Sequence, residues 1–153
     1  MCLEFKHTEI LDKIVSSLQE PGIILHHTGN NNNFTTNNNY HKSLWPNFQS
    51  FYGFWMGYHY YIDKECRVFS CRREDELGAH TLGYNKRIGI AVEGNSDKGG
   101  VSAKQIQTLE KLVEWRLKEL KLSWKDVGGH RDFSPTICPG NDIYNWLTIK
   151  KNN

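Results

Sequence analysis

Residues 23–28 read Ile-Ile-Leu-His-His-Thr, a short apolar run that ends in two adjacent histidines. An apolar run of this length that follows Pro21-Gly22 indicates a strand buried on both faces of a sheet. Successive side chains of a strand point to opposite faces, so only one of His26 and His27 can face a given site. The stretch therefore predicts a central strand that presents a histidine at its carboxyl end.

Strands and helices alternate along the rest of the chain. Ser102 begins the clearest helix, because Gln105 follows three residues later and completes a capping box. The Asn-rich segment 30–39 has a biased polar composition, and we expect it to be a loop without regular structure. The other expected helices are residues 8–19, 40–51 and 141–147, and the other expected strands are residues 57–62, 67–71 and 87–93. This order predicts an α/β fold, a single domain over residues 1–153 with a central mixed β-sheet flanked by helices.

The composition restricts the classes of partner. The chain has 153 residues, of which 38% are hydrophobic and 24% charged, as in an ordinary globular domain. A net charge of +2 is too small to indicate nucleic-acid binding. No segment approaches the roughly 20 apolar residues that a membrane span requires, and residues 1–20 lack the apolar core of a secretory signal peptide. We expect a monomer that is synthesised in the cytoplasm and binds neither membrane nor nucleic acid.

Cys66 and Cys71 are close in the sequence but are not expected to form a disulfide. Arg67-Val68-Phe69 between them predicts a strand, which would hold the two cysteines about 16 Å apart. A disulfide requires Cα atoms about 4.4–6.8 Å apart. We therefore expect both thiols to be free.

Two further residues have the chemistry of metal ligands. His130 and Cys138 lie in residues 128–140, Gly-Gly-His-Arg-Asp-Phe-Ser-Pro-Thr-Ile-Cys-Pro-Gly. Imidazole nitrogen and thiolate both bind zinc, and a catalytic zinc site has three protein ligands and a fourth position for water. His26 would complete such a set. On residue chemistry alone a second interpretation stays open, in which these are ordinary histidines and a small core cysteine.

Five segments, in order along the chain, carry a resemblance to a known family. They are I-L-H-H-T (24–28), W-M-G-Y-H-Y-Y-I-D (55–63), G-A-H-T (78–81), N-K-R-I-G-I-A-V-E-G-N (85–95), and G-H-R-D with T-I-C-P-G (129–140). Together they resemble the zinc N-acetylmuramoyl-L-alanine amidases of the phage-lysozyme and peptidoglycan-recognition-protein type. The resemblance extends over most of the chain, from residue 24 to residue 140.

The resemblance implies roles for individual residues. His26, His130 and Cys138 would hold one zinc ion per chain at one end of the sheet. Tyr58, from the G-Y-H motif, would be catalytic, and so would Thr136, two residues before the ligand cysteine. Threonine at this position follows the recognition-protein pattern, whereas phage members carry lysine there.

Three more residues are candidates for substrate binding. We expect His80 to line the substrate groove, and Asn85 and Arg87 to bind stem-peptide or sugar groups. The alternatives are a loop cap for Asn85 and a solvated charge for Arg87.

The resemblance implies a peptidoglycan hydrolase in which a zinc-activated water cleaves the amide bond between N-acetylmuramic acid and L-alanine. Its partners would be peptidoglycan or muropeptides, and we expect a phage or prophage endolysin that acts on the cell wall after release. One alternative is a recognition module that binds without cutting, although such members typically lack the ligand cysteine. The other is a cytoplasmic recycling amidase, but those enzymes carry glutamate at the position of Ala91 and aspartate at that of Cys138.

Overall fold

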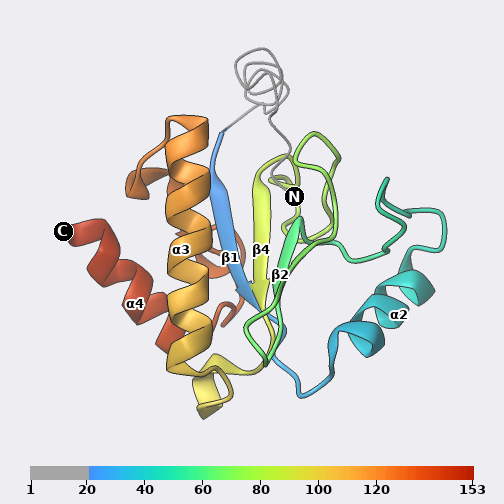
Figure 1. Cartoon of the computed structure of the whole chain (residues 1–153), viewed down its shortest axis with the longest axis horizontal. Helices are drawn as coiled ribbons and strands as arrows, with labels where there is room; N and C mark the ends of the chain where they lie inside the picture. The colour runs from blue at the N-terminus through green and yellow to red at the C-terminus, as the bar shows by residue number, and fades with distance from the viewer. Residues whose placement is uncertain (1–20) are drawn as a thin grey trace.

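The fold is built on a mixed five-stranded sheet with the strand order β3-β2-β4-β1-β5, seen in a computed structural model that describes residues 21–153 (Figure 1). The strands are β1 (Ile23–His27), β2 (Tyr60–Ile62), β3 (Val68–Ser70), β4 (Ile88–Val92) and β5 (Val127–Gly129), and the α-helices are α2 (Phe34–Leu44), α3 (Ala103–Leu120) and α4 (Asn141–Asn152). β3 runs antiparallel to β2, whereas the other neighbouring strands are parallel. The predicted α/β class with a mixed sheet is confirmed, and the helix expected over residues 8–19 lies outside the described residues.

The two faces of the sheet have different surroundings. β1 lies between β4 and β5, and all five of its residues are buried, as the apolar run predicts. Leu25 pairs with Ile90, and this face packs against α3 and α4 in the main hydrophobic core. His26 pairs with Ala91 on the opposite face, where Ala91 belongs to a second cluster that also contains Phe34 of α2. The alternation along β1 therefore directs one histidine away from the main core.

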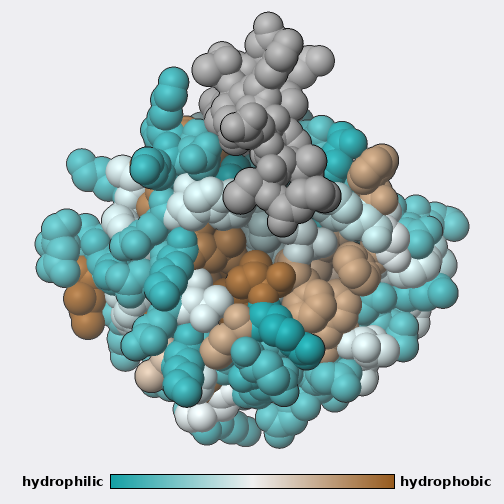
Figure 2. Space-filling model, viewed as in Figure 1, coloured by the Kyte–Doolittle hydropathy of each residue, from teal (hydrophilic) through white to brown (hydrophobic). Residues whose placement is uncertain are grey.

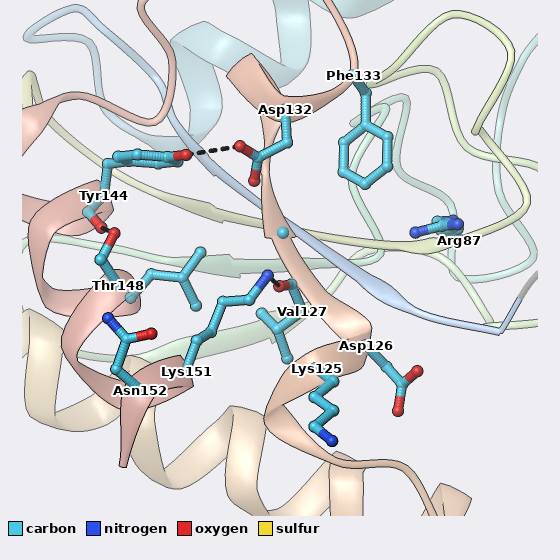
Figure 3. Close-up of a pocket in the computed structure, with 12 residues that line it drawn as sticks. Arg87, Lys125, Asp126, Val127, Asp132, Phe133, Tyr144, Thr148, Lys151 and Asn152 are labelled. Carbon is cyan, nitrogen blue, oxygen red and sulfur yellow. Dashed lines mark hydrogen bonds between the residues drawn. The ribbon is translucent and has the colours of Figure 1, made fainter.

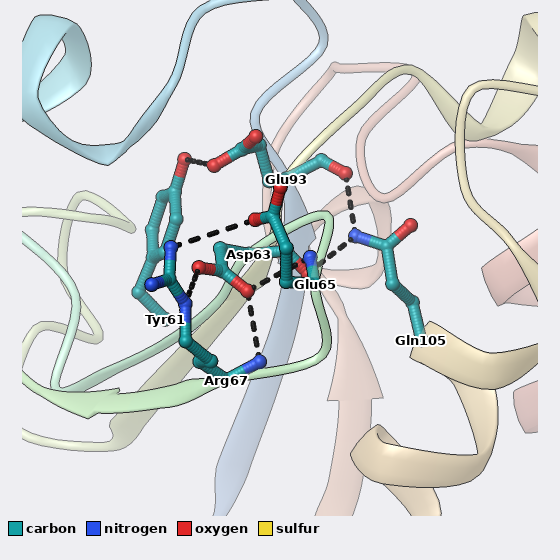
Figure 4. A network of polar contacts seen from close by, with 6 residues as sticks. All are labelled: Tyr61, Asp63, Glu65, Arg67, Glu93 and Gln105. Atoms are coloured by element: carbon teal, nitrogen blue, oxygen red, sulfur yellow. Dashed lines mark hydrogen bonds and ion pairs between the residues drawn. The ribbon is translucent and has the colours of Figure 1, made fainter.

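The amino end of α3 is fixed to the carboxyl ends of two strands. Ser102 Oγ accepts a hydrogen bond from Gln105 N (3.1 Å) and Gln105 Oε1 accepts one from Ser102 N (3.0 Å), so the predicted capping box is confirmed. Gln105 Nε2 also donates to the carbonyl groups of Asp63 (3.0 Å) and Glu93 (2.9 Å), which follow β2 and β4 (Figure 4). One glutamine thus caps the helix and aligns it with the sheet.

The prediction of a loop in the Asn-rich segment is wrong, because most of it belongs to α2. Asn33 is the N-cap residue, and its side chain accepts a hydrogen bond from Thr36 N (2.9 Å). Phe34 packs edge-on against Tyr61 with ring centroids 5.2 Å apart, and buried Asn37 donates to the Tyr61 hydroxyl (3.0 Å). These contacts with β2 override the low helix propensity of asparagine.

Other boundaries also differ from the prediction. α2 ends at Leu44, not at residue 51, and Trp45 has φ −134° and ψ 68°. Pro46 explains this end, because the residue before a proline disfavours the α conformation. The final helix is longer than expected and continues to Asn152. Regular pairing in β2 begins at Tyr60, three residues after the start of the predicted strand.

A buried ion pair joins the segment after β3 to α3. Arg116 Nη2 donates to Glu74 Oε2 at 2.8 Å, and the two side chains are 7% and 6% exposed. The Tyr60 hydroxyl donates to the other carboxylate oxygen at 2.6 Å. The carboxylate therefore has both a charged and a neutral donor inside the protein.

Polar and charged side chains cover much of the face seen in Figure 2, and hydrophobic atoms gather near its centre. Within residues 21–153, no helix combines the length and the apolar character needed to cross a membrane. Cys66 and Cys71 are both free thiols, as the strand between them predicts.

Candidate metal centre and active site

Three potential metal ligands meet at the carboxyl ends of β1 and β5. Leu25 pairs with Gly129 in parallel register, so the next residues of the two segments, His26 and His130, lie side by side with ring centroids 4.6 Å apart. Cys138 Sγ lies 3.6 Å from His26 Nδ1. The ligand atoms of these three residues all lie within 4.8 Å of one another, which is a cluster that can hold a metal ion.

Hydrogen bonds fix the segment that leads from His130 to Cys138, and Arg131 N donates to the carbonyl oxygen of Cys138 (2.9 Å). Asp132, at the end of the 3-10 helix η3 (His130–Asp132), accepts from Gly129 N (2.8 Å) and from the Tyr144 hydroxyl of α4 (2.6 Å). Thr136 Oγ1 accepts from Cys138 N (3.2 Å). The Thr136 oxygen is thus oriented by the backbone of a candidate ligand, and its own proton is left to donate elsewhere.

The electrostatic environment favours neutral imidazoles in this cluster. Burial lowers the pKa of His26 well below its usual value, and His80 and His130 lower it further. Burial likewise lowers the pKa of His130. Burial raises the pKa of the Cys138 thiol to about 12, so the thiolate requires a nearby cation to form. Two neutral nitrogens and one sulfur suit a borderline-soft cation, not a hard oxygen-seeking one.

Tyr58 lies beside this cluster. Its ring centroid is 5.1 Å from that of His26. Burial raises the pKa of the Tyr58 hydroxyl above its ordinary value, and the adjacent Cys138 adds to the effect. Tyr58 therefore stays protonated and can act as a hydrogen-bond donor, not as a base, at neutral pH.

Two side chains of α2 hold the segment that precedes this tyrosine. Asn38 Oδ1 accepts hydrogen bonds from the N–H groups of Trp55 (2.8 Å) and Met56 (3.1 Å). His41 Nδ1 accepts from Gly57 N (2.9 Å). Three consecutive backbone donors are thus satisfied by one helix face, which fixes the position of the tyrosine that follows.

Asn38 and His41 were not predicted from the sequence. The two residues are three apart, a spacing that places them on one face of a helix. That signal becomes readable only when α2 is known to be helical. The His41 ring also lies 5.6 Å from the Tyr58 ring, so it belongs to the wall of the same site.

The three candidates for substrate binding occupy different places. His80 is 8% exposed and its Nδ1 lies 3.1 Å from His26 Nε2. Asn85 Oδ1 accepts from the backbone N–H groups of His80 and Thr81, at 2.7 Å each, and so caps their loop. The Arg87 side chain does not join the cluster, because its guanidinium lies 4.9 Å from the Phe133 ring centroid. A substrate-binding role for each of the three stays a prediction.

Arg87 lines a separate hollow of about 320 Å³ between β5 and α4 (Figure 3). Lys151 crosses this hollow and donates to the carbonyl of Val127 at 2.8 Å. The residues around it include neither Tyr58 nor any of the three candidate ligands. The hollow is therefore distinct from the metal cluster.

Comparisons with known proteins agree with this geometry. Residues 18–141 match the family model for N-acetylmuramoyl-L-alanine amidase. Among solved structures, the chain is similar to the N-acetylmuramoyl-L-alanine amidase LysC from Clostridium intestinale URNW, with 29% identity and a TM-score of 0.73 over 89% of this chain and 87% of that one.

Two curated relatives are similar over a shorter part of the chain. The endolysin of Klebsiella phage KP32 is 33% identical over 99 residues, which are 60% of this chain and 63% of that protein. Peptidoglycan-recognition protein SC2 of Drosophila melanogaster is 29% identical over 99 residues, 63% of this chain and 54% of that protein. The match thus spans less than two-thirds of either relative. Because the family model covers most of the sequence and the candidate ligands converge, the chain belongs to the N-acetylmuramoyl-L-alanine amidase family.

Proposed function

We propose that this protein is a zinc-dependent peptidoglycan hydrolase that cleaves the amide bond between N-acetylmuramic acid and the first L-alanine of the stem peptide. The observation that carries the proposal is the convergence of His26, His130 and Cys138 within 4.8 Å, with Tyr58 beside them. Family membership and the similarity to an amidase and a phage endolysin support it.

Each side chain has a chemical task in this proposal. Zinc held by His26, His130 and Cys138 would supply an acidified water and polarise the amide carbonyl. The protonated Tyr58 hydroxyl donates a hydrogen bond to the oxygen that gains charge as the amide is attacked. The Thr136 hydroxyl is too weak an acid to protonate the leaving nitrogen at neutral pH, so it serves as a second donor to the same oxygen.

The proposal includes the setting in which the protein works. Residues 1–153 form a monomeric catalytic domain that acts on cell-wall peptidoglycan or on muropeptides. The similarity to phage endolysins supports action on the wall. The second candidate function is binding of the same polymer without cleavage, which the similarity to peptidoglycan-recognition protein SC2 favours.

The test is release of soluble peptide from purified peptidoglycan, with product masses and amino-terminal residues determined. We expect new L-alanine amino termini, loss of release with a zinc chelator, and recovery when zinc is added back. Cys138→Ser is the matched control, because it replaces the thiolate with a weak hydroxyl ligand and should abolish release. Binding of the polymer with no release by zinc-loaded protein would favour the recognition function instead.

A further inference from the structure

A second histidine lies directly behind the candidate ligand His26. His80 Nδ1 is 3.1 Å from His26 Nε2, and the two rings are nearly perpendicular, at 81°. On its far side, His80 Nε2 is 3.0 Å from the carbonyl oxygen of Arg87. The contacts form a continuous chain from the backbone of the segment before β4, through two imidazoles, to the metal cluster.

The carbonyl oxygen at one end sets the direction of every hydrogen bond in this chain. A carbonyl can only accept, so His80 Nε2 must carry a hydrogen. The other polar partner of His80 Nδ1 is the hydroxyl of Thr81 (3.0 Å), which is also uncharged, and a neutral His80 carries no hydrogen on Nδ1. Thr81 Oγ1 also lies 3.4 Å from His26 Nε2. The 3.1 Å contact between His80 Nδ1 and His26 Nε2 is a hydrogen bond only when Nε2 carries the hydrogen, because two lone pairs would otherwise face each other. His80 Nδ1 therefore accepts from His26 Nε2–H, and the lone pair of His26 is left on Nδ1.

That lone pair is at the atom that a metal would need. His26 Nδ1 is the nitrogen that lies 3.6 Å from Cys138 Sγ, within the cluster of candidate ligand atoms. The opposite tautomer would place a hydrogen on this nitrogen and remove it as a ligand.

The position of His80 is itself built into the fold. A Cβ atom added at Gly78 or at Gly89 would come within 2.6 Å of the His80 ring, so both glycines are needed to make its slot. Asn85 Oδ1 holds the backbone of His80 and Thr81 from outside, at 2.7 Å each. The ring thus lies against two glycines, and its main chain is fixed by Asn85.

We propose that His80 is a positioning residue, a buried acceptor that fixes the tautomer and ring orientation of His26 so that Nδ1 faces the metal. The inference deepens the proposed function and rests on its zinc site. It assigns His80 to the support of a ligand, not to the groove wall. Partners of this kind typically change metal affinity by about 10–100-fold when they are removed.

Two variants distinguish the effect of the hydrogen-bond acceptor of His80 from the effect of its side-chain volume. His80→Asn keeps an oxygen near the position of Nδ1, whereas His80→Leu fills the slot without an acceptor. Zinc dissociation constants are measured by competition with a chromogenic chelator. We expect His80→Leu to weaken zinc binding by about 10–100-fold and His80→Asn to stay much closer to wild type. Thermal unfolding of the zinc-free variants checks that both fold.

Nitrogen-15 NMR of the histidine side chains in zinc-loaded wild-type protein gives a second readout that needs no variant. We expect His26 to carry its hydrogen on Nε2 and to bind zinc through Nδ1. Ligation through Nε2, or unchanged zinc affinity in a folded His80→Leu, would overturn the positioning role while leaving the zinc site intact. Wild-type protein that binds no zinc would overturn the zinc site and the positioning role together.

Discussion

Tyr58 illustrates how burial decides which task a side chain can perform. Its hydroxyl stays protonated because burial raises its pKa, and its ring lies 5.1 Å from His26. Tyr58→Phe removes the donor and leaves the ring, so kcat for amide cleavage should fall by about 10²–10³-fold, the typical effect of losing one oxyanion donor. Zinc affinity, measured in parallel, should be unchanged. Full activity in this variant would exclude Tyr58 from the chemistry.

At the residue scale, the candidate metal ligands were easier to predict from the sequence than the residues that position the site through hydrogen bonds. His26, His130 and Cys138 carry metal-binding groups, and their motifs mark them regardless of the fold. His80 and Asn38 act through hydrogen bonds to residues 54 positions or 17–18 positions away. Such partners depend on how strands and helices pack, which the pattern of single residues does not encode.

The helix α2 is the element whose effect on the site is most direct. Asn38→Ala would leave the N–H groups of Trp55 and Met56 without their acceptor. An unsatisfied buried donor costs about 1–3 kcal/mol, so we expect the free energy of unfolding to fall by about 2 kcal/mol. Cleavage should slow as well, because the position of Tyr58 is loosened.

Asn38→Asp is the matched control, since it keeps an acceptor oxygen at the same place. Chemical denaturation and steady-state cleavage should both show a smaller loss than in Asn38→Ala. Equal losses in the two variants would mean that the acceptor is not what positions this segment.

The ion pair between Glu74 and Arg116 gives a stability prediction for the contact of α3 with the segment after β3. Among the residues that the structure describes, Arg116→Met leaves the buried Glu74 carboxylate with the Tyr60 hydroxyl as its one remaining side-chain donor. Breaking a buried pair in this way typically costs about 3–5 kcal/mol, which urea denaturation would measure. The double variant Glu74→Leu/Arg116→Met should be more stable than Arg116→Met alone. A double variant that is less stable would contradict this account.

Elements were predictable where one physical signal dominated. β1 is an uninterrupted apolar run, and α3 combines an apolar stripe with a capping box, so both were predicted correctly. α2 has no such stripe, and its helix depends on Phe34 and Asn37 packing against Tyr61. The helical structure of α2 therefore depends on a contact between segments far apart in the sequence, whereas its local composition predicted a loop.

For the whole molecule, buried neutral histidines predict a loss of stability in mild acid. Burial, together with Arg72, lowers the pKa of His41 to about 4, and burial also lowers the pKa of His59. An unfolded histidine titrates near 6.5. Below about pH 6.5 these histidines therefore bind protons in the unfolded chain but remain neutral in the folded protein. The free energy of unfolding falls as the pH drops toward 4.

Thermal unfolding in a chelating buffer at pH 7.5 and 5.0 measures this effect without interference from metal. The melting temperature should be lower at pH 5.0. His41→Asn keeps an acceptor for Gly57 N and removes one titrating group, so its melting temperature should change less between the two conditions. An identical change in both proteins would show that His41 makes no contribution.

The three candidate ligands are supplied by distant parts of the chain. His26 is the next-to-last residue of β1, and Cys138 lies 112 residues later. During translation the first ligand leaves the ribosome early, but its partners follow only after most of the domain has been made. The proposed activity would therefore require synthesis to pass Cys138, and nascent or truncated chains that stop before this residue would lack a ligand and are expected to be inactive.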